Sequence, residues 1–230
     1  MIGSQSVIAI IPARSGSKRL EGKNLKPLLG KPLIEWTISA SKKSKYIDKT
    51  LVSSDSQEII SISQKKGVCT QLRPKQFSDD EATTFSVVQY VLDKLDEKFE
   101  YVILLQPTSP LRTSENIDEA FELLNEKSAD AVVSVSELEH PLEWCNLIPP
   151  DLSLENFIDE KYKNCRSQDF KKYYRLNGSI FITNIKKLYK EETFMLSKNI
   201  FAYVMDQNKS VDIDTKSQFE LCQYLLRMGN

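Results

Sequence analysis

Residues 7–24 read VIAIIPARSGSKRLEGKN, an apolar run followed at once by a polar, basic loop. The run 7–11 is continuous and rich in β-branched side chains, which is typical of a strand covered on both faces. Such strands belong to parallel sheets, whose ligands bind beyond the carboxyl ends of the strands. The loop 13–27 is therefore the first place where a ligand is expected.

The remainder of the chain alternates expected strands with expected helices. Strands are expected at 50–53, 68–72, 101–105 and 131–135, and helices at 33–44, 56–66, 85–95 and 114–127, with Asp55 and Ser114 as helix caps. After an irregular stretch at 137–175, the pattern resumes with strands at 178–182 and 201–204 and helices at 185–189 and 217–227. This order predicts a mostly parallel, doubly wound, Rossmann-like α/β sheet in a single domain spanning 1–230.

The irregular stretch 137–175 is expected to be an insert in that domain. Pro141, Pro149 and Pro150 interrupt it, and its aromatic and charged residues show no clear period. In a compact enzyme, a long segment of this kind is usually a lid, an oligomer arm or a binding insert.

Composition excludes several classes of protein. The 31 Lys and Arg residues nearly balance the 32 Asp and Glu residues, which argues against strong attraction to nucleic acid or to an anionic membrane. The early apolar run ends at Pro12, too soon for a signal peptide or a membrane span, so a cytoplasmic protein is expected. The four cysteines are far apart and are expected to be reduced and mostly buried. A single histidine cannot build a His-rich metal site.

The loop after the first strand carries an unusual density of positive charge. Its basic residues are Arg14, Lys18, Arg19, Lys23 and Lys26, and Gly16 and Gly22 allow the backbone to approach a ligand closely. Cationic side chains beside free backbone N–H groups are suited to a triphosphate. Neither the P-loop pattern nor the G-x-G-x-x-G pattern fits this loop. The alternative interpretation is a solvated basic loop that binds nothing.

The segment 11–18 (IPARSGSK) with Lys23 and Asn24 resembles the signature of the CMP-sialic acid synthetases, also called N-acylneuraminate cytidylyltransferases. Further segments resemble motifs of that family in the same order: 52–55 (VSSD), 72–74 (LRP) with 80–84 (DEATT), 104–112 (LLQPTSPLR), 175–178 (RLNG) and 212–215 (DIDT). The resemblance spans 8–215. It implies a nucleotidyltransferase that joins CTP to a nine-carbon α-keto acid sugar and releases pyrophosphate.

This resemblance also implies site residues. The nucleotide would contact Ala13, Arg14, Lys23, Asn24, Arg73, Ala82 and Thr84, and the sugar would contact Gln106, Arg166, Gln168, Arg175 and Asn177. Lys23 and Arg14 are the expected phosphate ligands, since the reaction requires that negative charge be screened and two anions be held in line. A turn at Arg73 and a helix cap at Thr83 or Thr84 are the structural alternatives. Arg112 could pair with a phosphate or with a neighbouring helix.

Asp212 and Asp214 are the expected metal ligands. In extended backbone, side chains two residues apart lie on one face. Two carboxylates near phosphates suit Mg²⁺ or Mn²⁺, which would polarise the α-phosphate. Otherwise one Asp caps the last helix and the other is solvated. Lys23, Arg14, Asp212 and Asp214 are thus the expected catalytic residues, while the base could be an Asp, a metal-bound hydroxide or bulk water.

The insert 137–175 resembles the family's dimerisation arm, which implies a homodimer whose arm covers the neighbouring active site. Some sialic acid members carry a lysine where this chain has Glu143, followed here by Trp144. The exchange of a cation for an anion suggests a different acceptor, such as legionaminic acid, whose end is more apolar. A cytidylyltransferase for the shorter acid Kdo and a catalytically silent nucleotide-binding homologue are the competing interpretations.

Overall fold

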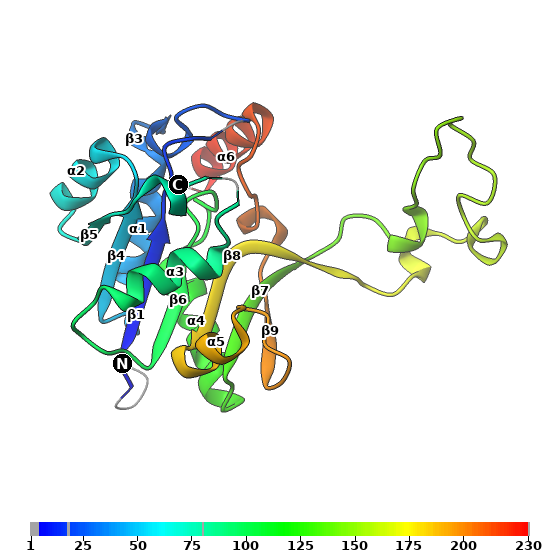
Figure 1. Cartoon of the computed structure of the whole chain (residues 1–230). Coiled ribbons are helices and arrows are strands. Elements are labelled where there is room, and N and C mark those ends of the chain that lie inside the picture. The colour runs from blue at the N-terminus through cyan, green and yellow to red at the C-terminus, as the bar shows by residue number, and fades with distance from the viewer. Residues whose placement is uncertain (1–4, 18, 80, 230) are drawn as a thin grey trace.

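The computed structural model describes residues 5–17, 19–79 and 81–229, so Lys18 and Asp80 of the quoted motifs lie outside the described residues. In this part of the chain a seven-stranded sheet has the order β5-β4-β1-β6-β8-β7-β9 (Figure 1). Its strands are β1 (Val7–Pro12), β4 (Lys49–Ser54), β5 (Cys69–Leu72), β6 (Tyr101–Leu104), β7 (Ala131–Glu137), β8 (Tyr174–Asn184) and β9 (Ile200–Val204). Only β8 among these runs antiparallel to its neighbours, so the predicted mostly parallel sheet is confirmed.

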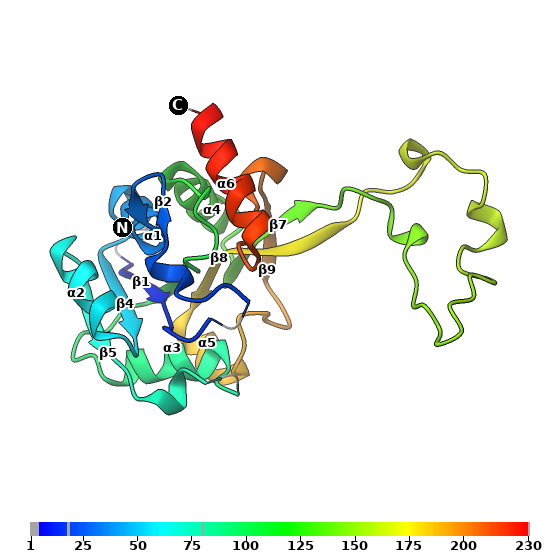
Figure 2. The ribbon, with the colours of Figure 1, turned by 90° about the horizontal axis from the view of Figure 1, so that it is seen from above.

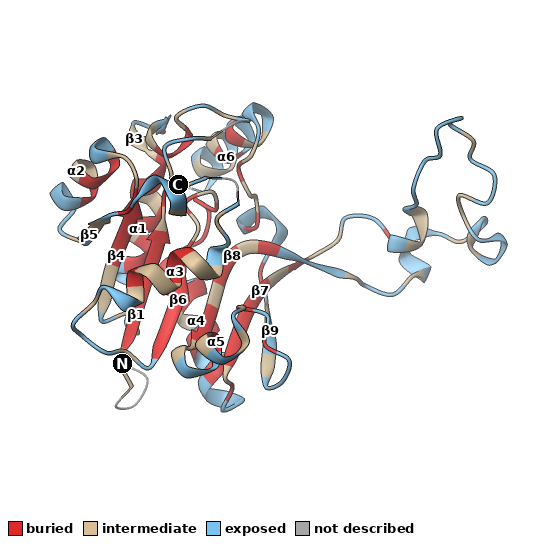
Figure 3. Ribbon diagram, viewed as in Figure 1, coloured by how far each residue is buried: buried red, intermediate tan, exposed pale blue. Residues whose placement is uncertain are grey.

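Helices cover both faces of the sheet, as predicted for a doubly wound fold. They are α1 (Leu33–Lys43), α2 (Gln57–Lys65), α3 (Thr84–Asp93), α4 (Ser114–Glu126), α5 (Ile185–Glu191) and α6 (Lys216–Met228). The alternation of β1 explains the two layers: Ala9 and Ile11 pack with α1, α2 and α4, whereas Ile8 and Ile10 pack with α3 and α5. The strands between the layers are accordingly buried (Figure 3).

Two of the predicted helix caps are wrong by one residue. Ser56, not Asp55, accepts the backbone N–H of Ile59 at the start of α2. At the start of α4, Thr113, not Ser114, accepts from Asn116 in a capping box. The Asp55 side chain instead contacts Ser15 in the loop after β1.

The strand β8 is longer than predicted and carries an irregularity beside the site. Its pairing with β7 shifts register between Val133 and Val135. At that level Gly178 has a φ of +73°, which a residue without a Cβ adopts readily. Because β8 lies between β6 and β7, this bulge comes next to the loop that follows β6.

The arm, defined here as residues 138–173, is shorter than the predicted insert because β7 continues to Glu137 and β8 begins at Tyr174. It projects away from the sheet in both views (Figures 1 and 2). Its own packing rests on three rings: Phe170 lies 5.5 Å from Trp144 and 5.4 Å from Tyr162, measured between centroids. Several of its large apolar side chains are exposed, with Leu147 at 89%.

The expectation of mostly buried thiols is wrong. All four cysteines are free, but Cys69 and Cys145 are exposed and Cys165 is half-buried. Cys222 is buried, and this burial raises the pKa of its thiol to about 12. Among the helices of the described residues, none has both the length and the apolar character that crossing a bilayer requires.

Candidate active site

The loops after β1 and β6 meet at the carboxyl ends of two adjacent strands. The chain continues to one side of β1 with β4 and β5 and to the other side with β6, so the strand order reverses here. Ligands of open α/β sheets bind at such a switch point. A cavity of about 410 Å³ opens there, and its lining includes Arg14, Lys23, Asn24, Arg73, Ala82, Thr84, Gln106 and Asp214. These eight residues were all predicted from the sequence as site residues.

Lys23 joins the N-terminal loop to the segment before α6. It is 9% exposed, and its Nζ donates to the carbonyl oxygen of Ile213 at 2.5 Å and to Asp214 Oδ1 at 3.1 Å. Ile213 in turn donates its N–H to the carbonyl oxygen of Thr108 at 2.8 Å, in the loop after β6. Three segments that are far apart in the sequence therefore meet at one backbone position. Arg19 binds the other oxygen of Asp214, Oδ2, at 2.8 Å.

Asp212 lies beside this junction. Its Oδ1 is buried and has no hydrogen-bond partner among the described residues. Burial raises the pKa of Asp212, and the charge of Asp214 raises it further, while a hydrogen bond from Thr108 and the charges of Lys23 and Arg175 oppose the rise. Between the two aspartates, Ile213 is fully buried in the core. The carboxylates thus interact with each other across a residue that faces the interior, as extended backbone predicts.

The donor set near Asp212 and Asp214 fits a Mg²⁺ ion. Among the described residues there is no group of three or more His, Cys, Asp or Glu side chains that could enclose a metal. Mg²⁺ does not need one, because it is commonly held by one or two carboxylates, substrate phosphates and water. An unpartnered buried carboxylate oxygen is costly, and a cation would satisfy it.

Asn24 and Arg14 shape the loop that faces the cavity. The Asn24 Nδ2 donates to the carbonyl oxygen of Arg14 at 2.9 Å, which fixes the loop. Its Oδ1 is buried without a partner among the described residues and is therefore available as an acceptor. Ala13 does not line the cavity: it is fully buried, and its N–H donates to Ser53.

Arg73 and Asp55 stand behind the same loop. Arg73 is 5% exposed, its guanidinium donates to Ser78 Oγ at 2.8 Å and to the carbonyl oxygen of Ser53 at 3.0 Å, and burial lowers its pKa to about 10. Asp55 accepts from the N–H of Ser15 at 2.8 Å and from its hydroxyl at 2.7 Å. Burial alone would raise the pKa of Asp55, but these bonds lower it. Asp55 thus anchors the basic loop, a role the sequence did not reveal.

The start of α3 contributes Thr84 to the cavity wall. Thr83, not Thr84, caps the helix by accepting from the N–H of Ser86 at 3.0 Å. Ala82 donates its N–H to Asp79 Oδ1 at 2.8 Å. The structural alternative therefore holds for Thr83, and Thr84 remains at the cavity.

Gln106 separates the main cavity from a second one of about 240 Å³. Both Gln106 and Thr84 line the two spaces. The rest of the second lining combines four apolar side chains with three polar ones: Phe85, Leu104, Phe181 and Phe194, and Thr83, Glu192 and Thr193. Sequence reasoning missed Phe181 and Phe194, because their positions on β8 and after α5 carry no signal beyond an apolar side chain.

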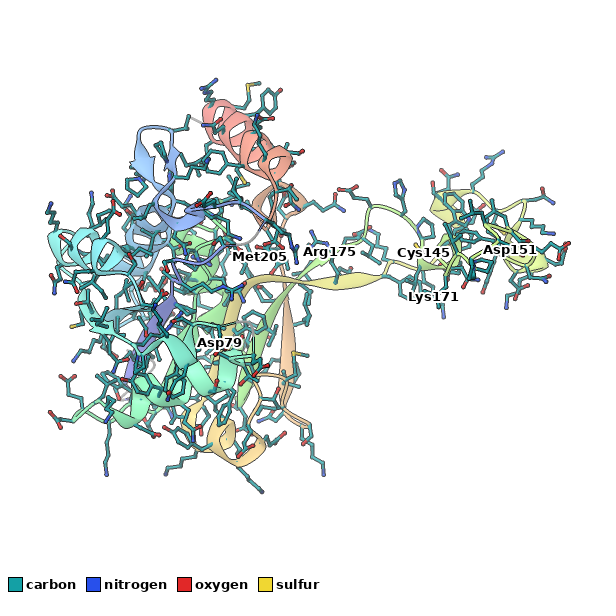
Figure 4. All side chains as sticks on the ribbon, turned by 45° about the horizontal axis from the view of Figure 1, so that its top comes forward. Asp79, Cys145, Asp151, Lys171, Arg175 and Met205 are labelled. Atoms are coloured by element: carbon teal, nitrogen blue, oxygen red, sulfur yellow. The ribbon has the colours of Figure 1, made fainter. Side chains whose placement is uncertain are left out.

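Arg175 lies at the root of the arm, close to the body of the molecule (Figure 4). Its charge lowers the pKa of Asp212, although it does not line the main cavity. Asn177 is 1% exposed, and its amide is fully engaged: it accepts from Ser134 Oγ at 2.6 Å and donates to Ser210 Oγ at 3.0 Å. This geometry places Asn177 inside the β8 bulge rather than at the cavity.

The structure does not bring Arg166 and Gln168 to the cavity of their own chain. Both are exposed on the arm, where Figure 4 shows Cys145, Asp151 and Lys171 well away from the body. Trp144 belongs to the arm's ring cluster, and Glu143 accepts from the Tyr173 hydroxyl at 3.1 Å.

Comparison with known proteins agrees with this geometry. Residues 8–228 match the family model described as cytidylyltransferase. The chain belongs to the cytidylyltransferase family. It is 37% identical to an N-acylneuraminate cytidylyltransferase of Escherichia coli over 94% of this chain and 51% of that protein, so it spans about half the length of that relative. It is 35% identical to a CMP-N,N'-diacetyllegionaminic acid synthase of Legionella pneumophila over 97% of both chains.

A solved structure supports the fold. The chain superimposes on a CMP:2-keto-3-deoxy-manno-octonic acid synthetase complexed with CTP with a TM-score of 0.71, at 16% identity, covering 98% of this chain and all of the other. At that identity the likeness concerns the fold alone.

Proposed function

We propose that this cytidylyltransferase joins CTP to a nine-carbon, sialic-type α-keto acid sugar. The anomeric hydroxyl would give up its proton to a base or to solvent while its oxygen forms a bond to the α-phosphorus of CTP. The bond from the α-phosphorus to the α–β bridging oxygen would break, and the electron pair would leave with pyrophosphate. The observation that carries the proposal is the contact between Lys23 and Asp214, 3.1 Å apart, at a cavity built from the loops after β1 and β6.

The cationic residues of the cavity would bind the triphosphate. Lys23 is already buried and held by a backbone carbonyl. Its side chain therefore loses little conformational freedom when a phosphate binds. Arg14 offers a planar fork of donors toward the same space. The free Oδ1 of Asn24 is suited to a ribose hydroxyl or to the amino group of cytosine. Arg73, which is tied to the backbone, would shape the nucleotide pocket.

Asp212 and Asp214 would hold Mg²⁺ or Mn²⁺. When bound, the ion would screen the phosphates and polarise the α-phosphate. The unpartnered Oδ1 of Asp212 supports this assignment, as does the position of Asp214 in the lining of the cavity. Before the ion binds, Arg19 and Lys23 neutralise Asp214.

The second cavity favours an acylated nine-carbon acceptor over Kdo. Sialic and legionaminic acids carry N-acyl groups, whose methyl ends suit a space lined by Phe85, Phe181 and Phe194. Kdo has no such group. Gln106, which faces both spaces, would hydrogen-bond the sugar. The L. pneumophila relative, matched over nearly its whole length, makes diacetyllegionaminic acid the first acceptor to test.

The acceptor site would be completed by a homodimer. Arg166 and Gln168 are exposed on an arm that projects from the body, and Arg175 lies at its root. A partner's arm laid over the cavity would bring cations and amides to the sugar carboxylate. We also propose a cytoplasmic location, because CTP is made there.

Pyrophosphate release tests the proposal. The protein is incubated with CTP, Mg²⁺ and, separately, diacetyllegionaminic acid, N-acetylneuraminic acid and Kdo. Release with an acylated nine-carbon acid, and its loss when UTP replaces CTP or when EDTA is added, is the expected result. Turnover of Kdo alone would support the shorter acceptor, and CTP binding by calorimetry without any turnover would support a silent homologue.

A further inference from the structure

Arg112 is a buried cation that the proposed reaction does not use. It lies near the end of the loop between β6 and α4, is 2% exposed and has no carboxylate partner among the described residues. Burial lowers its pKa to about 9, so it stays charged at neutral pH. The alternative that Arg112 binds a phosphate is not supported, because its guanidinium faces the interior and it does not line the main cavity.

The guanidinium instead connects three elements behind the site. One nitrogen, Nη1, donates to the carbonyl oxygen of Ser179 in β8 at 2.6 Å and to that of Gln106 at 3.3 Å. The other, Nη2, donates to Thr37 Oγ1 of α1 at 2.8 Å. A planar fork with several fixed donors can hold such a set at once, whereas the point charge of a lysine cannot.

Nη1 holds the carbonyls of Gln106 and Ser179, and the Gln106 side chain lies close to Gly178, the neighbour of Ser179. A Cβ added to Gly178, the neighbour of Ser179, would lie 3.2 Å from Gln106 Oε1 and 3.6 Å from Asp212 Oδ2. The Gln106 side chain therefore lies close against the strand backbone that Arg112 holds. Any shift of the Gln106 backbone relative to β8 would move its amide within the space between the two cavities.

We propose that Arg112 is a positioning residue that fixes Gln106 against β8 and so sets the binding geometry of the acceptor sugar. This inference rests on the proposed function, in which Gln106 contacts the sugar. Most of the lining of the main cavity, where the nucleotide would bind, comes from other elements: the loop after β1 and the segment from Arg73 into the start of α3. Loss of Arg112 should consequently weaken acceptor binding selectively and leave CTP binding intact.

A double-mutant cycle tests the proposal. Arg112→Lys, Gln106→Ala and the double variant are assayed for kcat and KM with the acceptor that the wild type uses best, and CTP binding is measured by calorimetry without acceptor. Arg112→Lys is expected to raise the acceptor KM about 10-fold, with the Kd for CTP changed less than about 2-fold. In the Gln106→Ala background the same change should raise the acceptor KM by less than about a further 2-fold, because the side-chain amide that Arg112 positions is gone. If the rise in acceptor KM of the double variant equalled the product of the rises of the two single variants, the residues would act independently and the proposal would be overturned.

Phe121→Leu is the matched control for stability. Phe121 is a fully buried residue of α4 that packs in the core against Tyr46 and lines neither of the two cavities. At an equal loss in Tm, this variant should leave the acceptor KM unchanged, and an equal rise in KM would reduce the Arg112 effect to general destabilisation and overturn the proposal.

Hydrogen exchange separates this inference from the proposed function. In the free protein, Arg112→Lys should speed exchange at the amides of 106–113, and Phe121→Leu should not. Unchanged exchange in this segment would overturn the positioning role even where turnover is normal. If the wild type turns over no sugar acid, the proposed function fails, while faster exchange would still support the clamp on Gln106.

Discussion

The loop after β1 and the arm are both irregular segments that interrupt the alternation of strands and helices, yet they are held in opposite ways. The loop is tied to other elements by the contacts of Ser15 with Asp55 and of Lys23 with Ile213, and it is braced internally by the bond from Asn24 to the Arg14 carbonyl. The arm packs mainly on itself, through the Trp144–Phe170 and Tyr162–Phe170 ring contacts. Apart from Ala13, the predicted site residues on the tied loop assemble around one cavity, and those on the arm do not.

This contrast divides the proposed reaction between two parts of the molecule. The nucleotide and metal half would be complete within one chain, since most of its residues line a single cavity, although Asp212 and Ala13 do not. The acceptor half would be shared between Gln106 in the body and Arg166 and Gln168 on an arm. A substitution in the nucleotide and metal half should inactivate the site of the protomer that carries it. A substitution on the arm should instead impair the partner's site, and a partner with an intact arm should restore the site of the substituted protomer.

The largest effect is expected from Asp214→Ala. Removal of a charged group that positions the metal and phosphates should lower kcat by at least about 100-fold. The measurement is steady-state pyrophosphate release at saturating CTP and Mg²⁺. Glu220→Ala, which removes an exposed carboxylate from the adjoining helix α6, is the matched control and should be nearly inert. Near-normal turnover by Asp214→Ala would refute the metal assignment.

Arg166→Ala tests the contribution of the arm to acceptor binding. It should lower kcat/KM for the acceptor by about 10- to 100-fold while the Kd for CTP stays constant, because the lost cation would face only the sugar carboxylate. Lys163→Ala, an exposed cation on the same arm, is the control. A loss of CTP affinity in Arg166→Ala would contradict the division between the two halves.

Mixing these two impaired variants tests whether the arm acts across a dimer. In mixed dimers of Asp214→Ala and Arg166→Ala, one of the two sites would combine an intact body with an intact arm. Random exchange of subunits should therefore restore activity to about a quarter of the wild-type value. No recovery after exchange, verified by native mass spectrometry, would mean that the arm serves its own chain.

The position of the tied half of the site could be predicted from the sequence for a physical reason. Polar residues that directly follow buried strands must gather at one edge of a parallel sheet, so the motifs around Lys23 and Gln106 could be placed from element order alone. The pairing of Asp212 with Asp214 followed from the two-residue period of extended backbone. Both inferences need only local patterns and topology.

What the sequence did not reveal depends on contacts between distant residues. Asp55 follows a strand and precedes a helix, which is typical of a cap, but its carboxylate binds Ser15 instead. Asn177 sits in a motif that suggests a ligand, but an inserted bulge in β8 turns its amide inward. The second cavity needs Phe181 and Phe194 side by side, and no periodic pattern encodes that proximity.

Asp55→Ala tests whether the loop after β1 binds CTP tightly because Asp55 holds it in place. Loss of both bonds to Ser15 should raise the Kd for CTP about 10-fold, since the loop must then be ordered by the ligand. Calorimetric titration with CTP measures this effect. Ser15→Ala, which keeps the backbone bond, should give a smaller change in the same direction. Equal affinity for wild type and Asp55→Ala would show that the loop needs no anchor.

The smallest effect is expected on thermal stability, from a substitution of Asp212 in the nucleotide and metal half. Because burial raises the pKa of Asp212, its ionised form opposes folding at neutral pH, and this penalty disappears as the pH falls and the carboxyl takes up a proton. Asp212→Asn should therefore raise the Tm of the metal-free protein by about 2–4 °C at pH 7.5, and the gain should vanish toward pH 4. Thermal unfolding followed by circular dichroism across this range measures it, with the exposed Asp96→Asn as the control. A loss of Tm at neutral pH would mean that Asp212 is stabilised as an anion by Lys23 and Arg175, and its unpartnered oxygen would then give no reason to expect a cation. A gain that is independent of pH would show that ionisation of Asp212 is not its cause, and would contradict this prediction.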